Sequence, residues 1–286
     1  MSKVDFNKEI IDEIKNFISA NNNKKLKETL KDIHYADIAE LIDNLNIDEA
    51  TYLIKLLKSD TTADALAEID DEKREKILKN LSAKEIAEEI TELDTDDAVD
   101  IISELPEERK EKVISQIEDN KHIEDIRELL TYDENTAGGL MAKELVKVNE
   151  NLSVLKCLNE MRSQAENVTR VHSIYVVDGK NKLKGRLSLK DLITANSKAK
   201  VKDIFIPNVD YVYVNDENEE VARKMSKYDL EAIPVVNSKK ELLGRITIDD
   251  IVDVIKDEAE KDYQLAAGIS NDVEPDDNLF NLVKAR

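Results

Sequence analysis

The chain has 286 residues, of which 37% are charged, and its formal net charge at pH 7 is −21. Hydrophobic residues make up 41% of it, which is enough for a sizeable core in two or three domains of ordinary size. A surface this acidic repels phosphates, so we expect no nucleic-acid partner. A single cysteine, Cys157, excludes an intramolecular disulfide and a multi-cysteine zinc site.

Neither a targeting segment nor a catalytic motif stands out along the chain. The N-terminus lacks the apolar stretch of a signal peptide, and no run approaches the ~18 apolar residues of a membrane span, so a soluble polypeptide is expected. The histidines His34, His122 and His172 have no ligand spacing. No Walker loop, dinucleotide fingerprint or nucleophile elbow occurs, which argues against an enzyme.

The first 130 residues carry a repeat of twelve residues. Large aliphatic residues recur at that spacing, at Ile33, Leu45, Leu57, Ile69, Leu81, Leu93, Leu105 and Ile117. Capping residues and carboxylates follow most of them, as in Ser82 with Glu85, which is typical of a helix N-terminus. Each unit predicts one short helix of roughly eight to ten residues, too short to persist alone. The helices must therefore stack into a superhelix.

One unit of this array is unusually acidic. Residues 91–110 hold eight acidic side chains against two basic ones. Asp96, Asp97 and Asp100 share one broad helix face, where like charges cost a few tenths of a kcal/mol each. A bound cation would remove that cost, whereas a plain solvated acidic face would tolerate it. The pattern leaves both readings open.

Residues 136–256 contain an internal duplication. Gly185 and Gly244, Ser188 and Thr247, and Asp191 and Asp250 are each 59 residues apart. Strand-like runs alternate with helical ones, so each copy predicts a small α/β unit that ends in an amphipathic helix.

The duplicated unit resembles a pair of CBS domains, which often bind adenine nucleotides in the clefts between them. The resemblance implies that Ser188 with Asp191, and Thr247 with Asp250, contact phosphate and ribose. The same pattern is also an ordinary helix capping box, so ATP or another adenine nucleotide is only one reading, with the first repeat the better candidate.

The resemblance then extends to nearly the whole chain. Residues 136–141, Thr-Ala-Gly-Gly-Leu-Met, resemble an element of MgtE magnesium transporters. The acidic run from Thr247 to Asp262 resembles the start of that family's connecting helix, and the capped helices resemble its N-terminal domain. The implied fold is multidomain: an all-α superhelical repeat domain, an α/β tandem CBS pair and a C-terminal connecting helix. We expect the repeat domain at residues 1–131, the two CBS domains at 136–198 and 199–256, and the connecting helix with the C-terminal tail at 257–286.

The resemblance also implies a mechanism in which Mg²⁺ bridges acidic faces of the N-terminal and CBS domains and favours the compact, closed-pore state. The implied metal ligands are Asp96, Asp97, Asp100, Gly139, Asp229, Asp250, Asp253, Glu258 and Asp262. Lys261 stands where the family is commonly acidic, which puts the metal site nearest the pore in doubt.

The family further implies a homodimer formed through the CBS domains and a place at the cytoplasmic face of the cell membrane. The transmembrane half of such a transporter is absent from this sequence, so we expect a cytosolic fragment rather than a free-standing protein. Two alternatives stay open: a soluble CBS regulator that senses adenine nucleotides, and an interaction scaffold built on the helical array.

Overall fold

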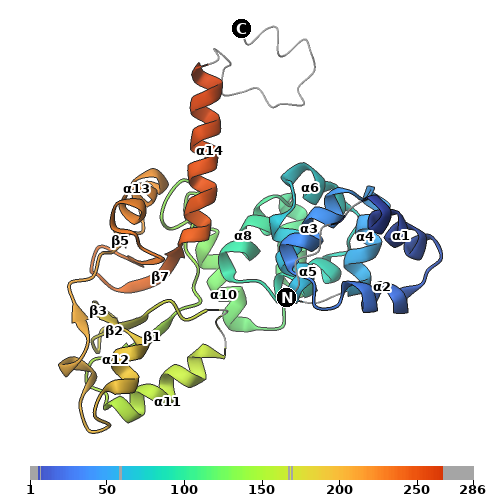
Figure 1. The fold of residues 1–286 in the computed structure, drawn as a ribbon. Coiled ribbons are helices and arrows are strands. Elements are labelled where there is room, and N and C mark those ends of the chain that lie inside the picture. The colour runs from blue at the N-terminus through green and yellow to red at the C-terminus, as the bar shows by residue number, and fades with distance from the viewer. Residues whose placement is uncertain (1–5, 7, 58–59, 167, 169, 267–286) are drawn as a thin grey trace. The chain divides into compact units, whose positions relative to one another are not determined.

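The computed structural model describes residues 6, 8–57, 60–166, 168 and 170–266, except the side chains of 257, 260, 262 and 264–266. The chain divides into two compact units, Met1–Thr131 and Tyr132–Arg286 (Figure 1).

The first unit is built of short helices. They are α1 (Lys8–Ser19), α2 (Asn23–Leu30), α3 (Tyr35–Asp43), α4 (Ile47–Leu57), α5 (Asp60–Glu68), α6 (Asp71–Lys79), α7 (Ala83–Ile90), α8 (Thr95–Ser103), α9 (Glu107–Ile114) and α10 (Asn120–Leu129). Packing joins helices that are two apart in sequence, such as α3 with α5 and α7 with α9. The array therefore stacks through alternate helices, and the predicted all-α repeat domain is confirmed.

The twelve-residue repeat marks the turns that precede the helices. Seven of its eight aliphatic residues are buried, and Leu57 is half-buried. Caps begin the helices as expected: the Ser82 hydroxyl accepts the Glu85 N–H at 3.2 Å, and a Glu85 carboxylate oxygen accepts the Ser82 N–H at 2.7 Å. This reciprocal box satisfies donors that the start of α7 would otherwise leave open.

Basic side chains satisfy the other ends of the helices. Lys73 Nζ donates to the carbonyl oxygens of Asp43, the last residue of α3, at 2.7 Å and of Leu45, in the turn that follows, at 2.8 Å. Arg109, 36 residues later, donates in the same way to Leu78 at 3.1 Å and Leu81 at 2.7 Å, at the end of α6. The last carbonyls of a helix have no partner inside it, so these bonds tie each turn to a later helix.

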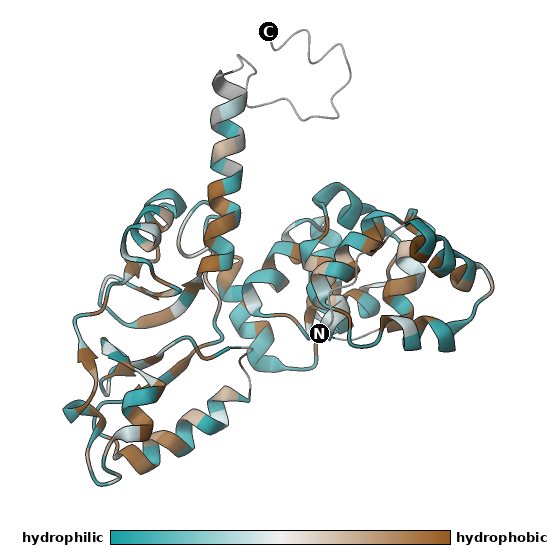
Figure 2. Ribbon diagram, viewed as in Figure 1, coloured by the Kyte–Doolittle hydropathy of each residue, from teal (hydrophilic) through white to brown (hydrophobic). Residues whose placement is uncertain are grey.

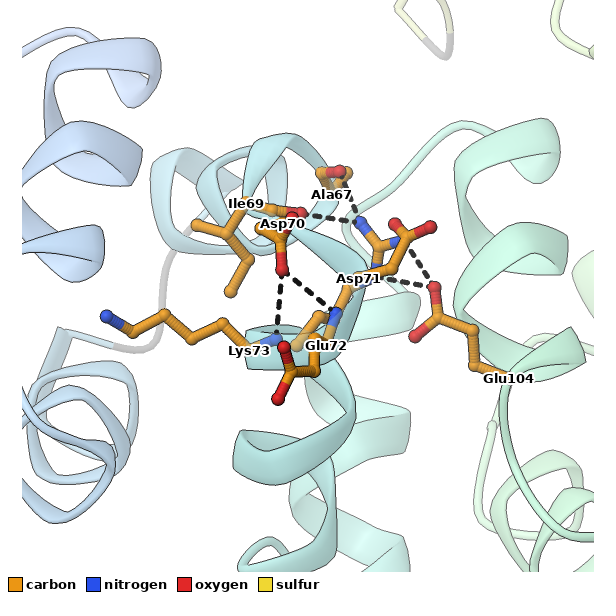
Figure 3. A network of polar contacts seen from close by, with 8 residues as sticks. Ala67, Ile69, Asp70, Asp71, Glu72, Lys73 and Glu104 are labelled. Atoms are coloured by element: carbon orange, nitrogen blue, oxygen red, sulfur yellow. Dashed lines mark hydrogen bonds and ion pairs between the residues drawn. The ribbon is translucent and has the colours of Figure 1, made fainter. Parts of the chain in front are cut away.

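Arg74 makes the densest set of these contacts, and Figure 3 labels four of the residues that it contacts, Ala67, Ile69, Asp71 and Glu104. Arg74 is 7% exposed, and its guanidinium donates to the carbonyls of Ala67 at 2.7 Å and Ile69 at 3.1 Å. It also pairs with Asp71 at 2.6 Å and, through two nitrogens, with Glu104 just after α8. One buried cation thus holds the α5–α6 turn against the end of α8.

The second unit contains two small sheets. The first joins β1 (Val146–Asn149), β2 (Ile174–Val177), β3 (Leu183–Leu187) and β4 (Ile206–Pro207) in that order, with α11 (Val154–Ala165), α12 (Leu189–Thr194) and a 3₁₀ turn (Val201–Asp203). The second joins β5 (Val212–Tyr213), β6 (Ala232–Val236) and β7 (Leu242–Thr247), with α13 (Asn218–Tyr228) and α14 (Ile248–Ala266). In each sheet the first pair of strands is parallel and the next is antiparallel.

The two repeats predicted from the sequence match each other at individual residues of the structure. Gly185 and Gly244 are both needed, because a Cβ on them would lie 2.1 Å from the Ile206 oxygen and 2.6 Å from the Ala142 oxygen. The two hairpins also exchange backbone bonds: the Leu183 N–H donates to the Lys240 oxygen and the Leu242 N–H to the Asn181 oxygen, both at 2.9 Å. The repeats are therefore joined reciprocally.

The last helix runs unbroken across the boundary that we expected between residues 256 and 257. Its first half packs on α13 and β7, and Figure 2 shows a hydrophobic band there before the helix extends beyond the sheet. Within the described part of the chain, no helix combines the length and apolar character that a membrane span requires.

The Arg74 contacts generate a stability prediction. Arg74→Met should lower the free energy of unfolding of the first unit by about 3–5 kcal/mol, because Glu104 loses its partner in a mostly buried position. The double variant with Glu104→Leu should recover most of the loss. Urea unfolding followed by circular dichroism measures both. Lys76→Met, which removes an exposed ion pair, is the control and should cost less than about 1 kcal/mol. An unchanged unfolding midpoint for Arg74→Met would contradict this account.

Candidate ligand sites

The acidic face of the first unit lies at the start of α8. Asp96 and Asp97 stand in its first turn, half-buried, and the Asp97 N–H donates to Asp96 Oδ1 at 3.0 Å. Asp100 is exposed one turn later. Burial opposes the charged form of Arg74, but Glu104, then Asp71 and last Asp100 outweigh it and raise the pKa of Arg74. The face therefore carries carboxylates that reach solvent, with one buried cation beside it.

The Thr136–Met141 element attaches to the start of the second repeat. The Ala137 N–H donates to the backbone carbonyl of Asp216 at 2.8 Å, and the Gly138 N–H donates to the carbonyl of Val214 at 2.9 Å. At Gly139 a Cβ would lie 2.6 Å from the Asp133 oxygen, so only glycine fits this turn.

The predicted acids of the second repeat differ in exposure. Asp229 is exposed, ends α13 and has a left-handed backbone with φ of 49°. On α14, Asp253 is exposed and pairs with Lys256 at 2.7 Å, and Glu258 is half-buried. Asp262 belongs to α14, but its side chain lies outside the described residues.

Asp250 differs from these acids because its carboxylate caps the start of α14. Its Oδ2 accepts the N–H and the hydroxyl of Thr247, both at 2.9 Å. Burial raises the pKa of Asp250 to about 6, against the opposing effect of these hydrogen bonds. A metal would have to draw this carboxylate away from Thr247.

These side chains do not form a complete metal site within either unit. Among the described residues, no three His, Cys, Asp or Glu side chains are grouped closely enough to hold a metal ion. Asp96, Asp97 and Asp100 belong to one unit, and the other predicted ligands belong to the second.

The two predicted nucleotide elements also differ. Ser188 and Asp191 are half-exposed, and the Ser188 hydroxyl donates to Asp191 Oδ2 at 2.6 Å and accepts the Asp191 N–H at 3.0 Å. Thr247 is 8% exposed, and its hydroxyl contacts both Asp249 and Asp250. The first cleft is therefore the more accessible one.

Two residues between the repeats were missed by the sequence reasoning. Tyr175 is 3% exposed and packs on Leu242 of the other repeat, and its hydroxyl has no hydrogen-bond partner among the described residues. Burial raises its pKa to about 12. Arg245 is also buried, and its Nη1 donates to the Arg170 carbonyl at 3.1 Å. Both stand in apolar-looking strands, so no spacing signal could have singled them out.

Comparisons with known proteins recover the same two parts. The MgtE intracellular N domain matches residues 33–135, and the CBS domain matches residues 137–198 and 201–257. The fold and these matches define a chain that joins an MgtE-type helical domain to a CBS-domain pair.

Individual relatives identify the family of this chain more closely. The magnesium transporter MgtE of Thermus thermophilus is 44% identical over 131 residues, 46% of this chain and 29% of that protein. The MgtE of Enterococcus faecalis is 39% identical over 140 residues, 49% of this chain and 31% of that protein. A crystal structure of the cytosolic domain of the Mg²⁺ channel MgtE in complex with ATP superposes with a TM-score of 0.79 at 33% identity, covering 85% of this chain and 99% of that one.

A second crystal structure, of the soluble part of a magnesium transporter, superposes with a TM-score of 0.78 at 30% identity and covers 87% of this chain and 98% of that one. The chain belongs to the MgtE family of magnesium transporters and corresponds to their cytosolic region. It spans only 29–31% of the length of the two curated relatives above. Because those relatives are transporters, the expectation that the chain is not an enzyme is confirmed.

Proposed function

We propose that this chain is the Mg²⁺-sensing regulatory region of a magnesium transporter, at the cytoplasmic face of the membrane that holds the transmembrane half. Family membership supports the setting. The observation that carries the sensing role is the presence of two acidic helix faces, at the start of α8 and along α14, on separate units of the chain.

Electrostatics supplies the driving force. Two carboxylates ~4 Å apart repel by roughly 1 kcal/mol in water and ~4 kcal/mol at an effective dielectric of about 20. Several such contacts exceed the roughly 1–3 kcal/mol that usually couples two allosteric sites. Mg²⁺ prefers oxygen ligands and keeps several waters, so it can bridge two such faces. The ion then favours the compact state because it binds that state more tightly.

The described geometry ranks the ligands. Asp97 and Asp100 on α8, and Asp229, Asp253 and Glu258 in the second unit, are at least partly exposed and can reach a hydrated ion. Asp253 would exchange its exposed pairing with Lys256 for the metal. Asp250 contributes mainly by fixing the start of α14 through Thr247.

A second function, binding of an adenine nucleotide, is supported by the first CBS repeat. Ser188 and Asp191 are accessible, and Tyr175 opposes Arg186, two residues before Ser188, in the strand register. A buried hydroxyl without a partner carries a desolvation cost that a ligand could relieve. The related cytosolic domain crystallised with ATP lends weight to this function.

We further propose a homodimer through the CBS domains. Leu189 and Ile193 on α12 are exposed, and so are their counterparts 59 residues later, Ile248 and Val252 on α14. Ile255 extends the second pair along the same helix face. A second copy of the chain, placed on a two-fold axis, would cover both matching apolar pairs in one self-complementary interface.

The sensing role predicts compaction with Mg²⁺. Small-angle scattering and limited proteolysis across a Mg²⁺ titration, with ionic strength matched by KCl, should show a smaller radius of gyration and slower cleavage at millimolar Mg²⁺. Asp97→Asn with Asp253→Asn, one substitution in each unit, should weaken the response about tenfold or more, since each loses a charged ligand.

The matched control for this experiment is Glu108→Gln with Glu160→Gln. It removes the same charge from exposed positions in the same two units and should respond like the wild type. If both double variants lose the Mg²⁺ response equally, net charge alone explains it. If the wild type keeps the same shape with and without Mg²⁺, the sensing role is refuted.

The nucleotide function predicts a role for one hydroxyl. Tyr175→Phe should weaken ATP binding, measured by calorimetry without Mg²⁺, roughly fivefold to tenfold, because it deletes one buried hydrogen bond. Stability should not fall, since that hydroxyl has no partner among the described residues of the free chain. Tyr213→Phe on β5 is the control and should leave affinity unchanged. ATP affinity that is indifferent to Tyr175→Phe would remove the tyrosine from the site.

The dimer predicts a loss of association on charging the apolar pairs. Ile193→Glu with Val252→Glu should shift the chain from dimer to monomer in sedimentation equilibrium at micromolar concentration, because buried carboxylates are costly to desolvate. Leu155→Glu charges an equally exposed apolar residue on α11 and should leave the dimer intact. A monomeric wild type, or a control that dissociates as readily, would overturn this interface.

A further inference from the structure

A hollow of about 360 Å³ lies on the second CBS repeat, between α13 and the edge strand β5. Val212 and one face of α13 line it, and that face presents Arg223, Lys224 and Lys227 followed by Tyr228. Three cations therefore converge on one concavity of a chain whose net charge is −21. Neither the Mg²⁺ function nor the Ser188 cleft uses any of these side chains.

The lining of the hollow holds three cations against two carboxylates, Asp216 and Glu220. Glu219 and Glu220 precede Arg223 by four and three positions, where helical ion pairs form readily, yet no ion pair of Arg223 occurs among the described residues. Asp216 also lines the hollow, but its Oδ2 accepts the Tyr213 N–H at 2.8 Å. Glu220 is the other carboxylate of the lining, one turn before Arg223 and Lys224.

Aromatic rings lie beside two lysines of the hollow, Lys224 and Lys227, and beside the neighbouring Lys240. Lys224 Nζ lies 5.6 Å from the centre of the Tyr211 ring and donates to the Tyr211 carbonyl, and Lys240 Nζ lies 5.0 Å from the same ring. Lys227 Nζ lies 5.1 Å from the centre of the Tyr228 ring. Cations packed on rings lose less freedom when an anion binds them, so this arrangement is partly preorganised.

The first repeat provides an internal comparison. Its helix α11 begins after Ser153, and α13 begins after Glu217, so the helices correspond at an offset of 64 residues, as do the buried strand residues Val148 and Val212. At that offset, Arg223, Lys224 and Lys227 correspond to Asn159, Glu160 and Ser163. The same scaffold therefore does not require cations at these positions.

We propose that this hollow binds the phosphate group of a small phosphorylated compound. A guanidinium matches the paired oxygens of a phosphate, and two ammonium groups add point charges beside it. The volume suits a sugar phosphate and lies in the range of small-molecule sites. Val212 and Tyr228 supply little apolar lining, so a polar body is favoured over a nucleobase.

Nuclear magnetic resonance on the ¹⁵N-labelled full chain tests the site with ribose 5-phosphate as the probe. Saturable amide shifts should appear in α13 and β5 and should be absent with ribose alone. Arg223→Gln with Lys227→Gln should weaken the affinity roughly tenfold or more, whereas Glu220→Gln should strengthen it, because a like charge leaves the lining. Sedimentation with vesicles that contain phosphatidic acid separates a lipid phosphate from a soluble one, and the concave site favours the soluble one.

The matched control is Lys156→Gln with Arg162→Gln, which removes two exposed charges from α11, the equivalent helix. It should keep the wild-type affinity within about twofold. Equal weakening in both double variants, shifts reproduced by KCl, or shifts that map to Ser188 and Asp191 would each overturn the proposal. The Mg²⁺ titration is independent of this outcome, since none of these substitutions touches a predicted metal ligand.

Discussion

Helices this short depend on one another for their last carbonyl groups. None of the described helices α1–α10 exceeds twelve residues, a length that is marginal in isolation. Lys73, Arg74 and Arg109 donate to carbonyls at helix ends and in the turns that follow, so the ends of α3, α5 and α6 are bonded by a residue from a later helix. Arg74 adds Glu104 to this arrangement and so reaches α8, the helix that carries the acidic face. The position of that face thus rests on a buried cation from another part of the array.

The distribution of charge follows from the same constraint. The chain has 63 acidic side chains, and some of them have structural roles as helix caps or as partners of a buried base. Glu85 is a clear case, because hydrogen bonds from Ser82 lower its pKa to about 2. Asp250 is the opposite case, in which burial outweighs the Thr247 bonds and raises the pKa to about 6. Carboxylates available to a cation are therefore a subset of the acidic pattern, and burial rather than spacing selects them.

The sequence was sufficient to predict the fold because both parts repeat. The twelve-residue spacing located the buried turn residues, and the 59-residue offset located both CBS hairpins down to Gly185 and Gly244. Site chemistry was less predictable, because Ser188 and Thr247 occupy equivalent positions but differ in exposure. The start of α14 packs against α13 and β7, and this tertiary packing is not encoded in the local Thr-x-x-Asp pattern. Tyr175 was missed for the same reason, since a tyrosine in a strand cannot be distinguished from an ordinary core residue by sequence alone.

Duplication explains why one fold can carry several unlike sites. The reciprocal bonds between the hairpins at Asn181 and Lys240 require only backbone groups and turn geometry, so side chains elsewhere were free to diverge. The first repeat leaves its Ser188 cleft accessible and has a polar α11 where the second has cations. The second repeat closes its Thr247 cleft around Asp250, extends into α14 and gathers bases on α13. Because these features are formed by different helices of the paired repeats, a ligand at one of them can change the stability of the pair without competing for another.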